Sequence, residues 1–154
     1  MSSLGDSYRD RYERALVPTA ERLEIFLRDH LESVPRIDRI TTRAKSVSRF
    51  LAKAGKVDSG ESKYSDPLCQ IQDQIGARIV TFYLDNVEVI AKEVEDYFHS
   101  IERQAIVPDK DSEFGYFGRH FVLLLPREVL SANEPEIPPF FELQIKTLFQ
   151  HDLA

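Results

Sequence analysis

The stretch that most constrains the fold of this chain is residues 140–147, which read Phe-Phe-Glu-Leu-Gln-Ile-Lys-Thr. Apolar and polar residues alternate strictly here, which is typical of a β-strand whose two faces differ. The apolar face would hold Phe141, Leu143 and Ile145, and the polar face Glu142, Gln144 and Lys146. A surface strand shows a similar pattern. An acid, an amide and a base in a row also suit a site that holds a metal ion and phosphate groups.

The remaining chain alternates between helical and strand periodicity. Helices are expected at residues 8–31, 47–54, 66–74 and 85–99 and from Thr147 onward, with Pro18 kinking the first helix or starting a second. Strands are expected at residues 37–42, 78–83, 100–107, 121–125 and 140–147, with loops at 55–66, 108–120 and 127–139 and a turn at 75–77. The last helix but one would begin with a capping box of Asp85 and Glu88. This order predicts an α/β or α+β fold, a mixed β-sheet flanked by helices, with a helical segment at 1–35 and the main domain at 36–154.

Length and composition narrow the class of protein. With 154 residues the chain is long enough for a hydrophobic core of its own. A formal net charge of −6 argues against DNA binding, which needs clustered basic surface, but is compatible with a small basic pocket. Cys69 cannot form an internal disulfide and is expected in the core. Without a leader or an apolar run near the ~18 residues of a membrane span, the chain is predicted to be cytoplasmic, with no membrane partner.

Four cations gather where a predicted strand passes into a predicted helix: Arg43, Lys45, Arg49 and Lys53. Such a cluster is commonly a solvated helix face. At a strand-to-helix junction it is equally well explained as a phosphate cradle, because the helix N-terminus adds N–H donors and the positive end of its dipole. Both interpretations remain open from these residues alone.

Four further residues have polar side chains in places that invite two interpretations. Asp73 and Arg78 flank the turn at 75–77, where an acid and an edge charge are common, yet Arg78 lies in an apolar strand and needs a partner if buried. Tyr116 lies between two glycines and is either a surface plug or a stacking platform for a base. His120 leads a buried strand and is either a hydrogen-bonded strand-end residue or part of a site.

Taken together, four short motifs follow one another along residues 43–151. They are Arg43-Ala44-Lys45 with Lys53, Asp73-Gln74-Ile75-Gly76-Ala77-Arg78-Ile79, Gly115-Tyr116 followed by His120, and Glu142-Leu143-Gln144-Ile145-Lys146-Thr147. In their order and residue types they resemble the alarmone synthetase domain of the RelA/SpoT family, and most closely its small alarmone synthetases. The resemblance implies a nucleotidyltransferase-like mixed sheet. It also implies an enzyme that transfers pyrophosphate from ATP to the ribose 3′-hydroxyl of GTP or GDP.

The resemblance also implies a role for each motif residue. Asp73 and Glu142 would be catalytic and bind Mg²⁺, and Glu142 would in addition orient or deprotonate the 3′-hydroxyl. ATP would be bound by Arg43 and Arg78, which would stack on adenine, and by Lys45 and Lys53, which would hold the phosphates. The acceptor nucleotide would be contacted by Tyr116, His120, Gln144 and Lys146. Homo-oligomers are common among such relatives, and the amphipathic first helix is compatible with one.

Two alternatives to this activity follow from the same motifs. The donor chemistry could serve another acceptor, an adenosine nucleotide or the 3′ end of tRNA, as in toxin-like relatives. The chain could also be a catalytically silent module that binds nucleotides and regulates. Alarmone hydrolysis is not expected, because no metal-dependent phosphohydrolase motif precedes Arg43.

The chain departs from the family pattern at several positions. Lys146 replaces the usual Arg and removes a bidentate fork, Phe114 replaces a polar residue, and Ser48 and Arg49 do not match the usual serine spacing before Lys53. Relatives continue beyond the His-Asp-Leu-Ala sequence with which this chain ends. The carboxy-terminal end of the synthetase domain is therefore expected to be incomplete.

Overall fold

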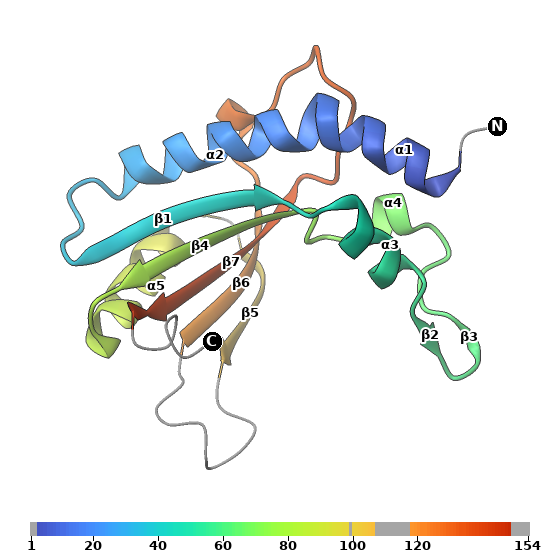
Figure 1. Ribbon diagram of the computed structural model, residues 1–154. Helices are drawn as coiled ribbons and strands as arrows, with labels where there is room; N and C mark the ends of the chain where they lie inside the picture. Colours follow the sequence, from blue (N-terminus) through green and yellow to red (C-terminus); the bar gives the residue numbers. More distant parts are fainter. Residues whose placement is uncertain (1–2, 99, 107–117, 149–154) are drawn as a thin grey trace.

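The computed structural model describes residues 3–98, 100–106 and 118–148 (Figure 1). The helical elements are α1 (Leu4–Arg11), the π-helical turn η1 (Tyr12–Leu16), α2 (Val17–His30), α3 (Val47–Ala54), α4 (Pro67–Gln70), α5 (Leu84–Tyr97) and the 3₁₀ turn η2 (Arg127–Val129). The strands are β1 (Ile37–Ala44), β2 (Val57–Asp58), β3 (Glu61–Ser62), β4 (Ile75–Thr81), β5 (Ser100–Ile106), β6 (Gly118–Leu124) and β7 (Phe140–Thr147).

A five-stranded mixed sheet with the order β1-β4-β7-β6-β5 forms the centre of the molecule. β7 runs parallel to β4 and antiparallel to β6, and the two outer pairs, β1 with β4 and β5 with β6, are antiparallel. The last strand of the chain therefore lies in the middle of the sheet (Figure 1). The predicted mixed sheet flanked by helices is confirmed.

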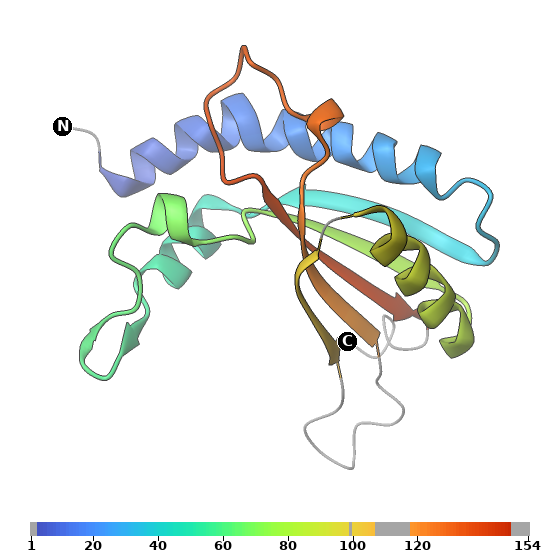
Figure 2. The same cartoon turned by 180° about the vertical axis from the view of Figure 1, so that it is seen from behind.

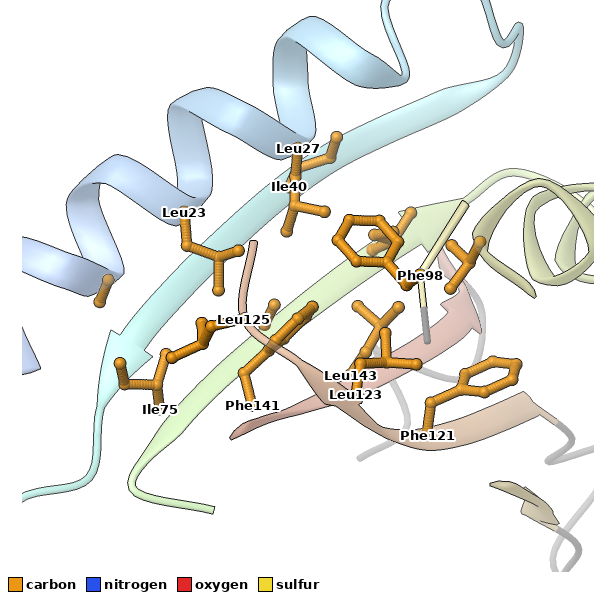
Figure 3. Packing of buried hydrophobic residues seen from close by; sticks show 14 of the residues in the cluster. Leu23, Leu27, Ile40, Ile75, Phe98, Phe121, Leu123, Leu125, Phe141 and Leu143 are labelled. Carbon is orange, nitrogen blue, oxygen red and sulfur yellow. The ribbon is translucent and has the colours of Figure 1, made fainter. Parts of the chain in front are cut away.

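One face of the sheet carries the hydrophobic core. Phe141, Leu143 and Ile145 are each 0% exposed, as the alternating pattern predicts, and they pack against residues of the neighbouring strands and of α2 and α5 (Figure 3). α2 lies along β1, and α5 covers β7, β6 and β4 (Figure 2). Burying each such large apolar side chain contributes about 1.5–3 kcal/mol. The apolar half of β7 is thus fixed in the core, and the opposite face of β7 is left for other contacts.

The amino-terminal segment is one long helical unit interrupted by a wider turn. Residues Tyr12–Leu16 form the π-helical turn, and Pro18 stands in the first turn of α2. Proline lacks an N–H, and its ring collides with the carbonyl four residues before it, so a local widening of the helix removes the clash. The predicted interruption at Pro18 is confirmed. The proposed division of the chain at residue 35 stays a prediction, and both helices contribute to the core.

The predicted loop at 55–66 contains a short hairpin, β2–β3, so that expectation is wrong for these residues. Its turn consists of Ser59 and Gly60, both with positive φ of 54° and 84°. Two such residues form the tight turn whose twist matches paired strands. The flanking residues are too polar to show strand periodicity, so the pairing was not visible in the sequence.

The segment from 66 to 77 also differs from expectation. α4 ends at Gln70 rather than near Gln74, and β4 begins at Ile75, so the predicted turn at 75–77 is part of a strand. Strand pairing decides this, because Ile75 and Gly76 pair with Ala44 and Arg43 of β1. Gly76 therefore occupies a position on a sheet face.

Three smaller expectations are corrected within the described residues. The capping box is not formed, since α5 begins at Leu84 and the Glu88 carboxylate binds Arg119 at 2.8 Å. Cys69 is exposed and lies outside the core. Thr147 belongs to β7, and the helix expected there falls mostly outside the described residues. None of the helices in the described ranges combines the length and apolarity that a membrane crossing requires.

Candidate active site

The polar face of the sheet brings the motif residues into two adjacent rows. In the first row Gly76 of β4 pairs with Arg43 of β1 on one side and with Glu142 of β7 on the other. In the second row Arg78 pairs with Gln144, which in turn pairs with His120 of β6. Residues two apart on a strand point to the same face, so the rows lie side by side. Segments far apart in the sequence thus meet on one surface.

A cleft of about 440 Å³ opens over these rows. It is lined by residues of β1, α3, β4 and β7 and of the turns between them: Arg43, Ala44, Lys45, Ser46, Arg49, Asp73, Gly76, Arg78, Glu142 and Gln144. A smaller hollow of about 200 Å³ continues along β1 past Thr41 and Thr42. The predicted site residues Arg43, Lys45, Asp73, Arg78, Glu142 and Gln144 all line this cleft.

Gly76 makes room in the floor of the cleft. It lies between Arg43 and Glu142 in the sheet, and a Cβ there would come no closer than ordinary contact, at 4.0 Å from the Glu142 carbonyl oxygen. Neither a steric clash nor a positive φ therefore requires glycine at this position. Its missing side chain keeps the space between a guanidinium and a carboxylate open. Sequence reasoning missed this role because it placed Gly76 in a turn.

Asp73 lies between two lysines at the α3 end of the cleft. Its two carboxylate oxygens are each 2.9 Å from an ammonium group, Oδ2 from Lys45 and Oδ1 from Lys53. All three side chains are largely buried, with 17–28% of their surface exposed. Burial alone would raise the pKa of Asp73, but the hydrogen bonds and charges of Lys53 and Lys45 outweigh it and hold this pKa below its usual value. Asp73 is an ionised, locally neutralised group.

Glu142 has a different environment in the middle of β7. Its Oε1 lies 3.2 Å from His120 Nε2, and its side chain is 26% exposed. The contact with His120 lowers the pKa of Glu142 below its usual value, although partial burial and the charge of Asp73 oppose the change. Asp73 and Glu142 both line the cleft, so the two carboxylates share one site.

The amino-terminus of α3 borders the same space. Ser46 is the N-cap residue, and its hydroxyl accepts a hydrogen bond from the Arg49 backbone N–H at 3.3 Å. Ser46 and Arg49 line the cleft together with Arg43 and Lys45. The helix thus directs its positive end toward the cleft. This placement favours the interpretation of the basic cluster as a phosphate cradle over that of a solvated helix face. Ser46 was not among the predicted site residues, and a serine directly before a predicted helix is the sequence signal that would have indicated it.

The predictions for three acceptor-side residues, Gln144, Lys146 and Tyr116, have different outcomes. Arg78 donates a hydrogen bond to Gln144 Oε1 at 3.4 Å, which provides the partner that a partly buried guanidinium needs. Lys146 is only 5% exposed, so it is buried rather than presented to solvent. Tyr116 lies outside the described residues. The binding roles of these residues stay predictions.

No family profile and no curated protein matches the chain. Solved structures do match. A GTP pyrophosphokinase family protein from Streptococcus pneumoniae has a TM-score of 0.70 at 20% identity, over 99% of this chain and 73% of the other. Small alarmone synthetase 1 from Bacillus subtilis bound to its product pppGpp has a TM-score of 0.65 at 25% identity, over 94% and 79%. The same enzyme bound to AMPCPP has a TM-score of 0.61 at 22% identity, over 92% and 73%. The chain has the fold of small alarmone synthetases, as the motif resemblance predicts.

Proposed function

We propose that this chain is a small alarmone synthetase, a pyrophosphotransferase that uses ATP as donor and GDP or GTP as acceptor. The observation that carries the proposal is the single cleft in which Asp73, Glu142 and the cations of the β1–α3 junction converge. The matching solved structures support it, because one is a GTP pyrophosphokinase family protein and two are small alarmone synthetase 1, bound to pppGpp in one and to AMPCPP in the other. The products would be AMP and guanosine tetra- or pentaphosphate.

The donor set fits Mg²⁺ as the cofactor. Mg²⁺ is usually held by one or two carboxylates together with substrate phosphates and water. Asp73 and Glu142 provide two carboxylates in one cleft, and no cluster of three or more His, Cys, Asp or Glu metal ligands occurs within the described ranges. When bound, the ion would neutralise charge on the phosphates of ATP.

The cations would bind the triphosphate from the other side. The ammonium groups of Lys45 and Lys53 form ion pairs with Asp73. The N-terminus of α3 lines the same cleft through Ser46 and Arg49. In this arrangement positive charge already lies where phosphate charge would arrive, and the lysines would exchange Asp73 for the phosphates. Arg43 pairs with Gly76 across β1 and β4, and Arg78 lies two residues beyond Gly76 on β4; both would contact the adenine with their planar groups.

Glu142 would act on the acceptor hydroxyl. In the transfer, the 3′-oxygen forms a bond to the β-phosphorus of ATP, and the bond from that phosphorus to the α,β-bridging oxygen breaks. AMP leaves with the bridging oxygen, and the hydroxyl proton passes toward Glu142. A general base works best with a pKa near the operating pH. Because the pKa of Glu142 is lowered in the free protein, we assign it primarily to accepting the hydroxyl hydrogen bond and orienting the oxygen.

An acceptor panel tests the proposal. The chain is incubated with Mg²⁺, ATP labelled in the β-phosphate, and GDP, GTP, an adenosine nucleotide or tRNA in parallel. Labelled guanosine tetra- or pentaphosphate, formed in equal amount to AMP, is the expected result. Label transferred to tRNA or to adenosine nucleotides alone would change the acceptor. If ATP binds but no AMP is released with any of the acceptors, the chain is a catalytically silent nucleotide-binding module and not an enzyme.

A further inference from the structure

The amino-terminal helix α1 reaches the site through Tyr8. This side chain is 0% exposed and its ring stacks on Phe50 of α3, with centroids 3.8 Å apart and planes inclined by 7°. Its hydroxyl donates a hydrogen bond to the backbone carbonyl of Lys45 at 2.6 Å. Burial, with the charge of Asp73 as a further cause, raises the pKa of the Tyr8 hydroxyl well above its usual value, so the hydroxyl remains a donor.

Arg11, one turn further along α1, reaches the segment that carries Asp73. Its Nη1 donates to the Leu68 carbonyl at 2.6 Å and to the Gln74 side-chain oxygen at 3.0 Å. Gln74 is 1% exposed, and its amide nitrogen donates to the carbonyls of Leu68 and Ile71. Arg11 therefore completes a buried polar network around the residue that follows Asp73.

These two attachments meet at the cleft. The backbone N–H of Lys45 donates to the Gln74 carbonyl at 2.8 Å, so the strand end carrying Lys45 and the turn carrying Asp73 are joined directly. Tyr8 holds the carbonyl of Lys45, and Arg11 holds the side chain of Gln74. Each bond is directed at the backbone or the neighbour of a site residue.

We propose that Tyr8 and Arg11 are positioning residues of the active site, which fix the Lys45 and Asp73 backbones relative to each other. This inference rests on the proposed function, because it assigns their effect to the binding of ATP. It makes α1 a support of the site, although α1 contributes no side chain to the lining of the cleft.

The π-helical turn explains how one helical unit serves both the sheet and the site. α2 buries Ala20, Leu23 and Leu27, and the Thr42 hydroxyl of β1 donates to the Ala20 carbonyl at 2.6 Å. In a regular α-helix, at about 100° per residue, Tyr8 would lie about 120° around the axis from Ala20. In the π-helical turn at Tyr12–Leu16 each residue rotates by less than about 100° around the helix axis, so the angle between Tyr8 and Ala20 becomes smaller. The π-helical turn thereby brings Tyr8 to the side that the core residues of α2 occupy.

Two variants, one control and one conservative replacement separate positioning from general support of the fold. Tyr8→Phe removes the hydroxyl and keeps the stacked ring, and Arg11→Met removes the hydrogen bonds and keeps most of the aliphatic stem. Arg9→Ala is the matched control on α1 itself, because Arg9 forms an exposed ion pair with Asp6, 3.7 Å apart. Amide hydrogen exchange is followed in the free protein. Affinity is measured by calorimetry with Mg²⁺ and a non-hydrolysable ATP analogue.

We expect faster exchange at residues 45–50 in Tyr8→Phe and at 71–76 in Arg11→Met, with wild-type exchange in α2 and β1. Affinity for the analogue should fall about three- to tenfold in Tyr8→Phe and about tenfold in Arg11→Met, because the loosened segments must be ordered on binding, at a cost comparable to the one or two hydrogen bonds lost. Arg9→Ala should match the wild type in both measurements. Restoring a charged donor with Arg11→Lys should recover part of the affinity.

Unchanged exchange at 45–50 and 71–76 in both variants would overturn the inference. Exchange that accelerates equally throughout α2 and β1 would also overturn it, because the two residues would then support the fold in general. A wild-type chain that fails to bind the analogue defeats the proposed function instead. The exchange comparison in the free protein would still decide whether Tyr8 and Arg11 position the two segments.

Discussion

The two carboxylates of the cleft have different kinds of partner. In the half beside α3, Asp73 lies between Lys45 and Lys53 at 2.9 Å each. In the half formed by β6 and β7, Glu142 contacts His120 at 3.2 Å. The lysines have flexible stems and stand at a strand end and on an eight-residue helix. Glu142 and His120, in contrast, stand on adjacent paired strands inside the sheet.

This difference indicates a division of tasks under the proposed function. The lysines beside Asp73 can exchange this carboxylate for the phosphates of a bound triphosphate. This half is therefore suited to binding ATP, the pyrophosphate donor. Glu142 is held by a strand whose inner residues, Phe141 and Leu143, are completely buried. Because the strand that carries it is rigid, the Glu142 carboxylate is suited to aligning one hydroxyl group.

Replacing the β7 carboxylate should give the largest effect. Glu142→Gln keeps the size of the side chain but removes its charge, so the acceptor hydroxyl loses its ionic hydrogen-bond acceptor. We expect transfer to fall by about 10²–10⁴-fold with affinity for ATP largely kept. The measurement is AMP release from ATP in the presence of GDP, alongside calorimetric ATP binding.

Glu128→Gln serves as the control for this change, because Glu128 is an exposed acid on η2 outside the lining of the cleft. It should retain wild-type transfer. Wild-type turnover in Glu142→Gln would refute the assigned role, and an equal loss of ATP binding would erase the distinction between the two halves.

The second change tests whether the lysines of the other half are exchangeable counter-ions. In Lys53→Met, Asp73 loses one ammonium group and the triphosphate loses one cation. We expect affinity for ATP to fall about tenfold, as loss of one charged hydrogen bond implies. Binding of Mn²⁺ to the nucleotide-free chain should become tighter, because one competitor for the carboxylate is gone.

Mn²⁺ binding can be titrated by electron paramagnetic resonance without any turnover. Lys56→Met is the matched control, since Lys56 is exposed and follows Lys53 by less than one turn. Weaker Mn²⁺ binding in Lys53→Met would contradict the interpretation of Lys53 as a counter-ion of Asp73. An equal tightening of Mn²⁺ binding in Lys56→Met would show that the effect comes from the net charge of the chain and not from the contact with Asp73.

The smallest expected effect is a difference in how stability depends on pH. Both carboxyls have a lower pKa in the folded chain than their ordinary values, 3.8 for Asp73 and 4.5 for Glu142. The stabilisation is therefore fully present above the ordinary values and is lost as pH falls through the lower folded values. Asp73→Asn and Glu142→Gln should each flatten the loss of stability on acidification.

Urea denaturation between about pH 6 and pH 3 provides this comparison, because the slope of unfolding free energy with pH reports the difference in bound protons. Slopes identical to the wild type in both variants would show that neither carboxylate is stabilised by its partners. A flattened slope in Asp73→Asn alone would place the acid-sensitive charge beside α3.

Much of the site could be predicted because its residues stand in short motifs whose local order is visible. Asp73, Arg78 and Glu142 were expected to meet, and the structure brings them into one cleft. The gap at Gly76 was missed because a glycine between polar residues is typical of a turn. Only its pairing with Arg43 and Glu142 makes it a strand residue.

The support beneath the site was also beyond sequence reasoning. Tyr8 and Lys45 are separated by 37 residues, and Arg11 and Gln74 by 63. A tyrosine on an amphipathic helix has the pattern of an ordinary core residue. Neither bond has a periodicity or a spacing that would indicate it.

The sequence by itself determined the order along the chain of the five strands of the central sheet and the two unlike faces of β7, because side-chain alternation is a local property of an extended backbone. It also determined which residues carry charge to the site. Tertiary structure alone decided that β7, the last strand in the chain, lies between β4 and β6, and that Lys45 and Lys53 enclose Asp73. These depend on which distant segments pair when the core is buried, and such pairings leave no mark on the spacing of neighbouring residues.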